Sequence, residues 1–141
     1  MYKNQEGYAD PTAGQALANI RREEKARLGY MPLVYICSPF RGDVEGNMRN
    51  ARKYCAFALS RHALPIATHL LFPQFLEDND PAERNLGLRA GLELLARCEE
   101  LWVCGPEISP GMSREIQFAQ GLGIPIRQVE PAAALQRGLS L

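Results

Sequence analysis

The sequence predicts a three-layer α/β fold, with a parallel sheet of four to five strands and helices on both of its faces. Two observations support this prediction. Short β-rich apolar runs alternate along the chain with segments of helical periodicity, as in proteins built from strand-helix-strand units. The apolar runs also show little polar alternation, which is typical of parallel strands buried on both faces. With 141 residues, 46% of them apolar, the chain can bury one core but not two.

Residues 1–30 are predicted to form a polar lead-in and a helix that precede a domain at 31–141. Asp10 followed by Pro11 is typical of an N-cap and a first helical residue, so a charged helix is expected to run to about Arg27. The sparse apolar residues of this helix are Ala16, Leu17, Ile20 and Ala26. Such a helix packs on the outside of a domain or against a second subunit, and we expect a homo-oligomer.

The domain begins with Leu33–Cys37, a short apolar run that predicts a central strand. A loop with Pro39 and Gly42 follows, and an amphipathic helix is expected from Asp43 to about His62, with apolar residues spaced by three or four. Leu64–Ala67 is predicted as a second strand, because its proline stands near the strand start, where a missing amide is tolerated.

Residues 68–79 are predicted to be a long connection, of the kind that often carries function in compact domains. The next helix has three start signals in Asp80, Pro81 and Glu83, which fit an N-cap, a first-turn proline and an acid three residues after the cap. It is expected to end near Arg97. Its predicted apolar face consists of Leu88, Leu92 and Leu95.

Leu101–Cys104 is predicted as a third strand, followed by a helix that carries Glu115 in its first turn and ends at Gly123. Ile124–Ile126 is expected to be a fourth strand. Open α/β sheets place their chemistry beyond the carboxyl ends of the strands, which is where Glu115 falls. The helix dipole there favours an ionised acid, so Glu115 is the leading candidate for an anionic catalytic group.

Composition gives no sign of a macromolecular partner. Lys plus Arg equals Asp plus Glu at 16 each, so no overall field attracts nucleic acid or an anionic membrane. No apolar run has the length of a signal peptide or a membrane span, and we expect a cytoplasmic protein. The four cysteines form no C-x-x-C pair, and structural thiols are favoured over disulfides or a metal site. No metal or cofactor is expected.

Two stretches carry a family likeness: Val34–Gly42, and Gly111–Ala119 together with Leu122–Pro125. They resemble the nucleoside 2-deoxyribosyltransferase-like superfamily, which includes deoxynucleoside monophosphate N-glycosidases and uncharacterised bacterial and phage families. The resemblance covers about residues 33–128. It implies a flavodoxin-like or Rossmann-like fold and an enzyme that cleaves or transfers the N-glycosidic bond of a small nucleoside or nucleotide.

The resemblance also implies roles for particular residues. Glu115 matches the superfamily's nucleophile, Tyr35 matches a tyrosine near it, and the loop after the first strand matches the part that holds a sugar or 5'-phosphate. The candidate binding residues are Ser38, Pro39, Phe40, Arg41, Gly42, Asn47, Gly111, Met112 and Ser113. A second group must protonate the departing base. The superfamily commonly places an aspartate where this chain has Gly91, so either His69 or an acid of residues 77–80 takes that role, or full transferase chemistry is absent.

Simpler interpretations remain for the same residues. Tyr35 is also a strand aromatic that packs in a core, His69 a polar residue at a strand end, and Asn47 a local cap. Trp102 and Phe118 are predicted core residues. The same pocket could also bind a nucleotide or a ribosylated metabolite without turning it over, as a sensor does.

Overall fold

The structure is a computed structural model, which describes residues 14, 16–17, 19–20 and 29–129. The chain divides into two compact units, Met1–Met31 and Pro32–Leu141. In the first unit, the described residues before Gly29 are helical. The remainder of the predicted N-terminal helix and the tail after Glu130 lie outside the described residues. No helix in the described part of the chain is long and apolar enough to span a membrane.

The second unit contains a four-stranded, fully parallel sheet with the strand order β2-β1-β3-β4. Its strands are β1 (Leu33–Cys37), β2 (Leu64–Ile66), β3 (Glu100–Val103) and β4 (Ile126–Gln128). The predicted fold class is confirmed. The fourth strand begins two residues later than predicted, because the amide of Ile124 donates to the carbonyl of Ala119 and so belongs to the end of the preceding helix.

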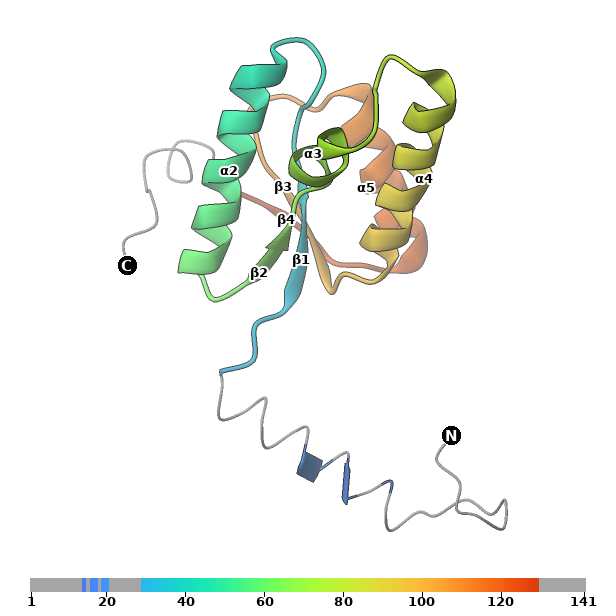
Figure 1. Ribbon diagram of the computed structural model, residues 1–141. Coiled ribbons are helices and arrows are strands. Elements are labelled where there is room, and N and C mark those ends of the chain that lie inside the picture. Colours follow the sequence, from blue (N-terminus) through green and yellow to red (C-terminus); the bar gives the residue numbers. More distant parts are fainter. Residues whose placement is uncertain (1–13, 15, 18, 21–28, 130–141) are drawn as a thin grey trace, which may run out of the picture. The chain divides into compact units, whose positions relative to one another are not determined.

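Helices cover both faces of this sheet (Figure 1). α2 (Val44–Ser60) packs on one face, and α4 (Pro81–Ala96) and α5 (Pro110–Leu122) pack on the other. In the predicted core, Trp102 is buried on the α2 side, whereas Phe118 is half-buried and packs against the cluster on the α5 side.

The central strand β1 explains why the sequence shows so little polar alternation. Val34 and Ile36 belong to the core cluster on the α2 side. Tyr35 and Cys37 belong to the cluster on the side of α4 and α5. Both faces of the strand are therefore buried, and Tyr35 points toward the two helices that carry Gly91 and Glu115.

Side-chain caps fix where the helices begin. Asp43 accepts a hydrogen bond from Gly46 N at 3.1 Å, Asp80 from Ala82 N at 3.0 Å, and Ser109 from Met112 N at 3.2 Å. Glu83, the acid three residues after the Asp80 cap, lies in the first turn of α4, and its carboxylate accepts from the amide of Glu77 at 3.4 Å. α5 ends at Gly123, whose φ of 72° is the left-handed conformation that favours glycine.

The long connection predicted over residues 68–79 contains helical structure. α3 (Thr68–Leu71) begins directly after β2, and the 3₁₀-helix η1 (Phe72–Gln74) continues it. Four residues are enough to close one turn, since the amide of Phe72 donates to the carbonyl of Thr68. The consequence is that Thr68 and His69 are held at the carboxyl edge of the sheet rather than on an irregular loop.

Candidate active site

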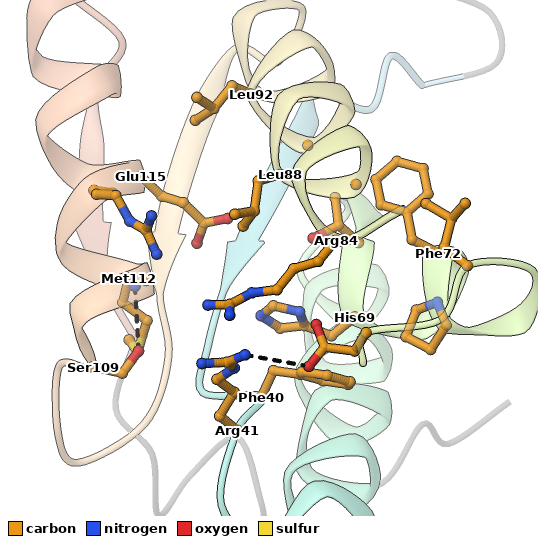
Figure 2. Close-up of a pocket in the computed structure, with 18 of the residues that line it drawn as sticks. Phe40, Arg41, His69, Phe72, Arg84, Leu88, Leu92, Ser109, Met112 and Glu115 are labelled. Carbon is orange, nitrogen blue, oxygen red and sulfur yellow. Dashed lines mark hydrogen bonds and ion pairs between the residues drawn. The ribbon is translucent and has the colours of Figure 1, made fainter. Parts of the chain in front are cut away.

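The carboxyl ends of β1 and β3 mark the switch point of the sheet. After β1 the chain forms β2 on one side of β1, and it then crosses to form β3 on the other side. Parallel α/β sheets bind ligands in the crevice at such a point. Here a cavity of about 330 Å³ is lined by the loop after β1, by α3 and the turn after it, by α4 and by the start of α5. Figure 2 shows the side chains that converge on it.

Glu115 lines this cavity from the second turn of α5. The helix begins at Pro110 after the Ser109 cap, and its first turn holds no acid, so the predicted first-turn position was wrong. Burial raises the pKa of the Glu115 carboxyl, whereas hydrogen bonds from Tyr35 and Cys37 and the charge of Arg114 lower it. Burial, which is the largest effect, therefore opposes the ionised form that the helix dipole was expected to favour.

Tyr35 holds the carboxylate from the strand below. Its hydroxyl donates a hydrogen bond to Oε2 of Glu115 and lies 3.2 Å from Oγ1 of Thr68. Because Tyr35 gives its only proton to the carboxylate, Thr68 is the donor in the second bond. Burial and the charge of Glu115 raise the pKa of Tyr35, which keeps it a phenol. Tyr35 is thus both a fully buried core residue and a site residue.

Thr68 is a site residue that the sequence did not predict, as is Arg84. The side chain of Thr68 is buried, with 6% of its surface exposed, and it lines the cavity. One signal was present in the sequence. Thr68 stands directly after the second strand, so it falls at the same sheet edge as the end of β1.

Gly91 lies on the face of α4 that borders the hydrogen bonds from Thr68 to Tyr35 and from Tyr35 to Glu115. A Cβ atom there would lie 3.6 Å from the hydroxyl oxygen of Tyr35 and 3.7 Å from Cγ2 of Thr68, which are ordinary contacts. The position where the resemblance implies an aspartate is therefore beside the tyrosine that holds Glu115. A Cβ atom would therefore fit at this position, but glycine provides none.

His69 lies at the other end of the cavity. Its Nε2 is 3.0 Å from the carbonyl oxygen of Ser38, and because a carbonyl only accepts, Nε2 carries the proton. Burial lowers the pKa of His69, which favours the neutral ring. The ring stacks on Phe40, with centroids 4.9 Å apart. His69 therefore reaches the site, with its N–H bonded to the backbone.

The same end of the cavity carries positive charge. Arg41 and Asp78 form an ion pair at 3.6 Å between partly exposed side chains. Arg84 extends from α4 toward the same space, beside His69 and Arg41 (Figure 2). Ser38 contributes a hydroxyl that is buried without a hydrogen-bond partner among the described residues. These groups can bind an anionic or hydroxyl-bearing part of a ligand.

An apolar wall faces the charged groups. Phe72, Leu76, Leu88 and Leu92 line the cavity from η1, the turn after it and α4. Leu88, predicted on the core-facing side of α4, has 41% of its surface exposed, whereas Leu95 is fully buried. Apolar walls with a few polar groups are typical of small-molecule sites.

The cavity brings together most of the predicted site residues but not all of them. Those that line it are Tyr35, Ser38, Phe40, Arg41, His69, Gly111, Met112 and Glu115. Pro39, Gly42, Asn47 and Ser113 are not among the lining residues. The side-chain amide of Asn47 instead donates to the carbonyls of Phe40 and Arg41, at 3.0 and 3.1 Å. Asn47 thus holds the loop in shape.

Pro39 supports the site from behind. A Cβ atom on Gly105, in the loop after β3, would lie 3.3 Å from Cδ of Pro39, and the φ of Gly105 is 112°. A glycine at this position therefore lets the loops after the two central strands approach each other.

In the described part of the chain, no group of three or more His, Cys, Asp or Glu side chains is placed to hold a metal ion.

The fold and the cavity define a flavodoxin-like α/β domain with a half-buried carboxylate at its switch point. By sequence, the chain belongs to the family described as a domain of unknown function, DUF7768, whose model matches residues 32–129. No curated protein matches the chain.

Among solved structures, the chain is similar to a 2-deoxyribosyltransferase from the psychrotolerant bacterium Bacillus psychrosaccharolyticus. The TM-score is 0.58 and the sequence identity 14%, over 68% of this chain and 70% of that chain. At this identity, the likeness establishes a shared fold.

Proposed function

We propose that the protein is an enzyme that cleaves or transfers the N-glycosidic bond of a nucleoside or nucleotide, with Glu115 as its nucleophile at C1' of the sugar. The observation that carries this proposal is the placement of Glu115. It is a half-buried carboxylate, held by Tyr35, in the wall of a cavity at the switch point of the sheet. The similarity in fold to a 2-deoxyribosyltransferase supports the same reaction class.

The chemistry proceeds through an oxocarbenium-like state. The bond between C1' and the base nitrogen breaks, and its electron pair leaves with the base. A carboxylate oxygen of Glu115 stabilises the positive sugar carbon or bonds to it as a glycosyl ester. Tyr35 acts as a positioning residue, because its bond to Oε2 orients the carboxylate so that Oε1 is the oxygen that attacks. Water or a second base then displaces the ester.

The two ends of the cavity bind different parts of the substrate. The apolar wall around Leu88 takes the base, and the loop after β1 with Ser38 and Arg41 takes the sugar or its 5'-phosphate. Ser38 has a buried hydroxyl available for this purpose.

The test is release of free base from a panel of 2'-deoxynucleosides and their 5'-monophosphates. Glu115→Gln is expected to lose roughly 10³-fold or more in kcat/KM, the order found when a group that acts in the transition state is removed. Glu93→Gln is the matched control, because Glu93 is exposed on α4 and pairs with Arg97. No turnover by the wild type, or equal turnover by the two variants, would contradict the proposal.

A second candidate function is a sensor that binds the same ligand without turnover. The observation that favours it is Gly91, which leaves no acidic side chain beside the hydroxyl of Tyr35. A sensor is expected to show thermal stabilisation by a nucleotide without any release of base. A ligand at one hundred times its dissociation constant adds about 2.7 kcal/mol to the free energy of unfolding.

We also propose that the protein is a cytoplasmic homo-oligomer whose N-terminal helix takes part in assembly. Leu17 and Ile20 in that helix are exposed. Light scattering on the full chain and on a chain that starts at Met31 tests this role. Equal oligomeric masses would remove the N-terminal helix from the assembly.

A further inference from the structure

The proton donors nearest Glu115 are already engaged. When a neutral base departs, its nitrogen receives an electron pair and needs a proton from a neighbouring acid. The hydroxyl of Tyr35 and the thiol of Cys37 donate to Glu115, and the hydroxyl of Thr68 donates to Tyr35. None of these protons is available to a leaving group unless the hydrogen bonds that hold the nucleophile are broken.

His69 is poorly placed to supply the proton. Its Nε2–H is donated to the carbonyl of Ser38, and desolvation lowers the pKa of the ring, which favours the neutral form without a proton on Nδ1. The unpartnered hydroxyl of Ser38 can donate a hydrogen bond, but an aliphatic alcohol does not give up its proton near neutral pH. Arginine side chains also remain protonated throughout.

The remaining acids of the cavity are Glu77, Asp78 and Glu83, which lie directly before α4 or in its first turn. Asp78 pairs with Arg41, and Glu83 accepts from the amide of Glu77. Glu83 is eight residues before Gly91 on α4, which is about 12 Å along a helix. At Gly91 itself, beside the hydroxyl of Tyr35, there is no side chain. The described part of the cavity therefore contains a nucleophile without a general acid next to it.

We infer that the substrate is an N-glycoside whose base already carries a positive charge, such as a pyridinium or an N7-alkylated purine. This inference rests on the proposed function. The electron pair of the broken bond neutralises the cationic base, which leaves as a neutral molecule and needs no proton. A carboxylate oxygen of Glu115 bonds to C1', and water then attacks C1', releases the carboxylate and gives one proton to the solvent.

The lining of the cavity suits a cationic ring. The carboxylates that line it are Glu77, Asp78, Glu83 and Glu115, and the guanidinium groups are those of Arg41, Arg84 and Arg114. Carboxyl groups thus outnumber guanidinium groups by one. Phe72 adds an aromatic surface to the apolar wall, and cations bind favourably to the faces of such rings.

A matched pair of substrates tests the inference with the full-length protein. 7-Methylguanosine 5'-monophosphate and guanosine 5'-monophosphate, each in the ribose and 2'-deoxyribose forms, differ within a pair only by the methyl group and its charge. We expect kcat/KM for the charged member to exceed that for the neutral member by at least about 100-fold, because general acid catalysis contributes at least that factor when it is present.

The pH dependence of kcat/KM also distinguishes the charged substrate from the neutral one. Without a general acid, the neutral substrate must take its proton from solvent. At pH values above the pKa of Glu115, its cleavage therefore slows about tenfold for each unit of pH rise, whereas cleavage of the charged substrate does not. A preference below 100-fold would overturn the inference and leave the proposed function standing. No cleavage of these substrates, of nicotinamide mononucleotide or of the 2'-deoxynucleoside panel would overturn the proposed function and the inference with it.

Gly91→Asp and Gly91→Asn form a matched pair of variants. Both fill the space beside Tyr35, where a Cβ meets only ordinary contacts, but only the aspartate brings a carboxyl group that can carry a proton. The preference for the charged substrate is expected to fall about 100-fold in Gly91→Asp and to keep its wild-type ratio in Gly91→Asn. The same change of ratio in both variants would assign Gly91 a steric role and overturn the inference.

Discussion

Tyr35 and Glu115 are 80 positions apart in the chain, and the hydroxyl of one donates a hydrogen bond to the carboxylate of the other. This bond joins the central strand β1 to helix α5 at the carboxyl edge of the sheet. It provides the charged form of Glu115 with a donor inside a buried site, where burial otherwise favours the neutral acid.

Removal of this donor is predicted to shift the pH dependence of activity. A nucleophilic Glu115 acts only when ionised, so activity is lost as the pH falls through its raised pKa. Tyr35→Phe removes the bond that lowers this pKa, and the acid limb of the kcat/KM profile is expected to move to higher pH. Tyr54→Phe is the control, because Tyr54 is buried in the cluster on the other face of the sheet. Equal acid limbs in wild type and Tyr35→Phe would contradict the role of Tyr35.

Glu115 is also predicted to reduce the stability of the fold at neutral pH. Its pKa is higher in the folded than in the unfolded state, so the folded state binds more protons, and stability falls as the pH rises from the unfolded pKa through the folded one. Glu115→Gln is therefore expected to melt at a higher temperature than wild type at pH 7. The difference should vanish near pH 4, where both proteins carry a neutral group.

Thermal denaturation of Glu115→Gln and of Glu93→Gln across this range measures the effect. Glu93 is exposed and controls for a general change in surface charge. A lower melting temperature for Glu115→Gln at pH 7 would show that the carboxylate stabilises the fold, and so contradict the prediction.

The sequence predicted the order of strands and helices because most elements have local causes. Asp80 and Ser109 cap helices through bonds to amides two or three residues away, and Gly123 ends a helix through its own conformation. β1 was predicted to the residue, since burial of both its faces makes its apolar run continuous. Such features act within a few residues and are visible in one sequence.

The parts of the site that were missed depend on contacts between distant segments. Thr68 enters the site because β2 pairs beside β1, and its hydroxyl meets that of Tyr35, 33 positions away. The protonation preference of Glu115 follows from burial, which local position in a helix does not reveal. Asn47 was proposed to bind ligand, but it donates to two carbonyls of the neighbouring loop, a geometry that the sequence alone leaves open.

Thr68 is predicted to act through Tyr35. Thr68→Val keeps the shape but removes the donor to the tyrosine hydroxyl, and we expect a loss of about 1 kcal/mol in the free energy of unfolding. Thr68→Val is also expected to change the pH profile of kcat/KM. Thr68→Ser keeps the hydroxyl, so its pH profile is expected to match that of the wild type. Chemical denaturation measures the stability change. Identical pH profiles for Thr68→Val and wild type would limit Thr68 to a packing role.

Arg84 is predicted to recognise an anionic group of the substrate. Its side chain points into the charged end of the cavity beside Arg41 (Figure 2), and no described carboxylate forms an ion pair with it. A hydrogen bond to a charged group is worth roughly 1.5 to 3 kcal/mol. Arg84→Gln is therefore expected to weaken binding of a nucleoside 5'-monophosphate about 10-fold to 100-fold. Binding of the matching nucleoside should be unchanged.

Arg89→Gln is the control for this measurement, because Arg89 is exposed on the same helix and does not line the cavity. Titration calorimetry on both variants in the Glu115→Gln background measures affinity without turnover. The difference between nucleotide and nucleoside should shrink at high salt in the wild-type pocket, because salt screens the attraction between partly exposed charges. An equal loss of affinity for nucleotide and nucleoside in Arg84→Gln would place Arg84 against the base or sugar rather than the phosphate.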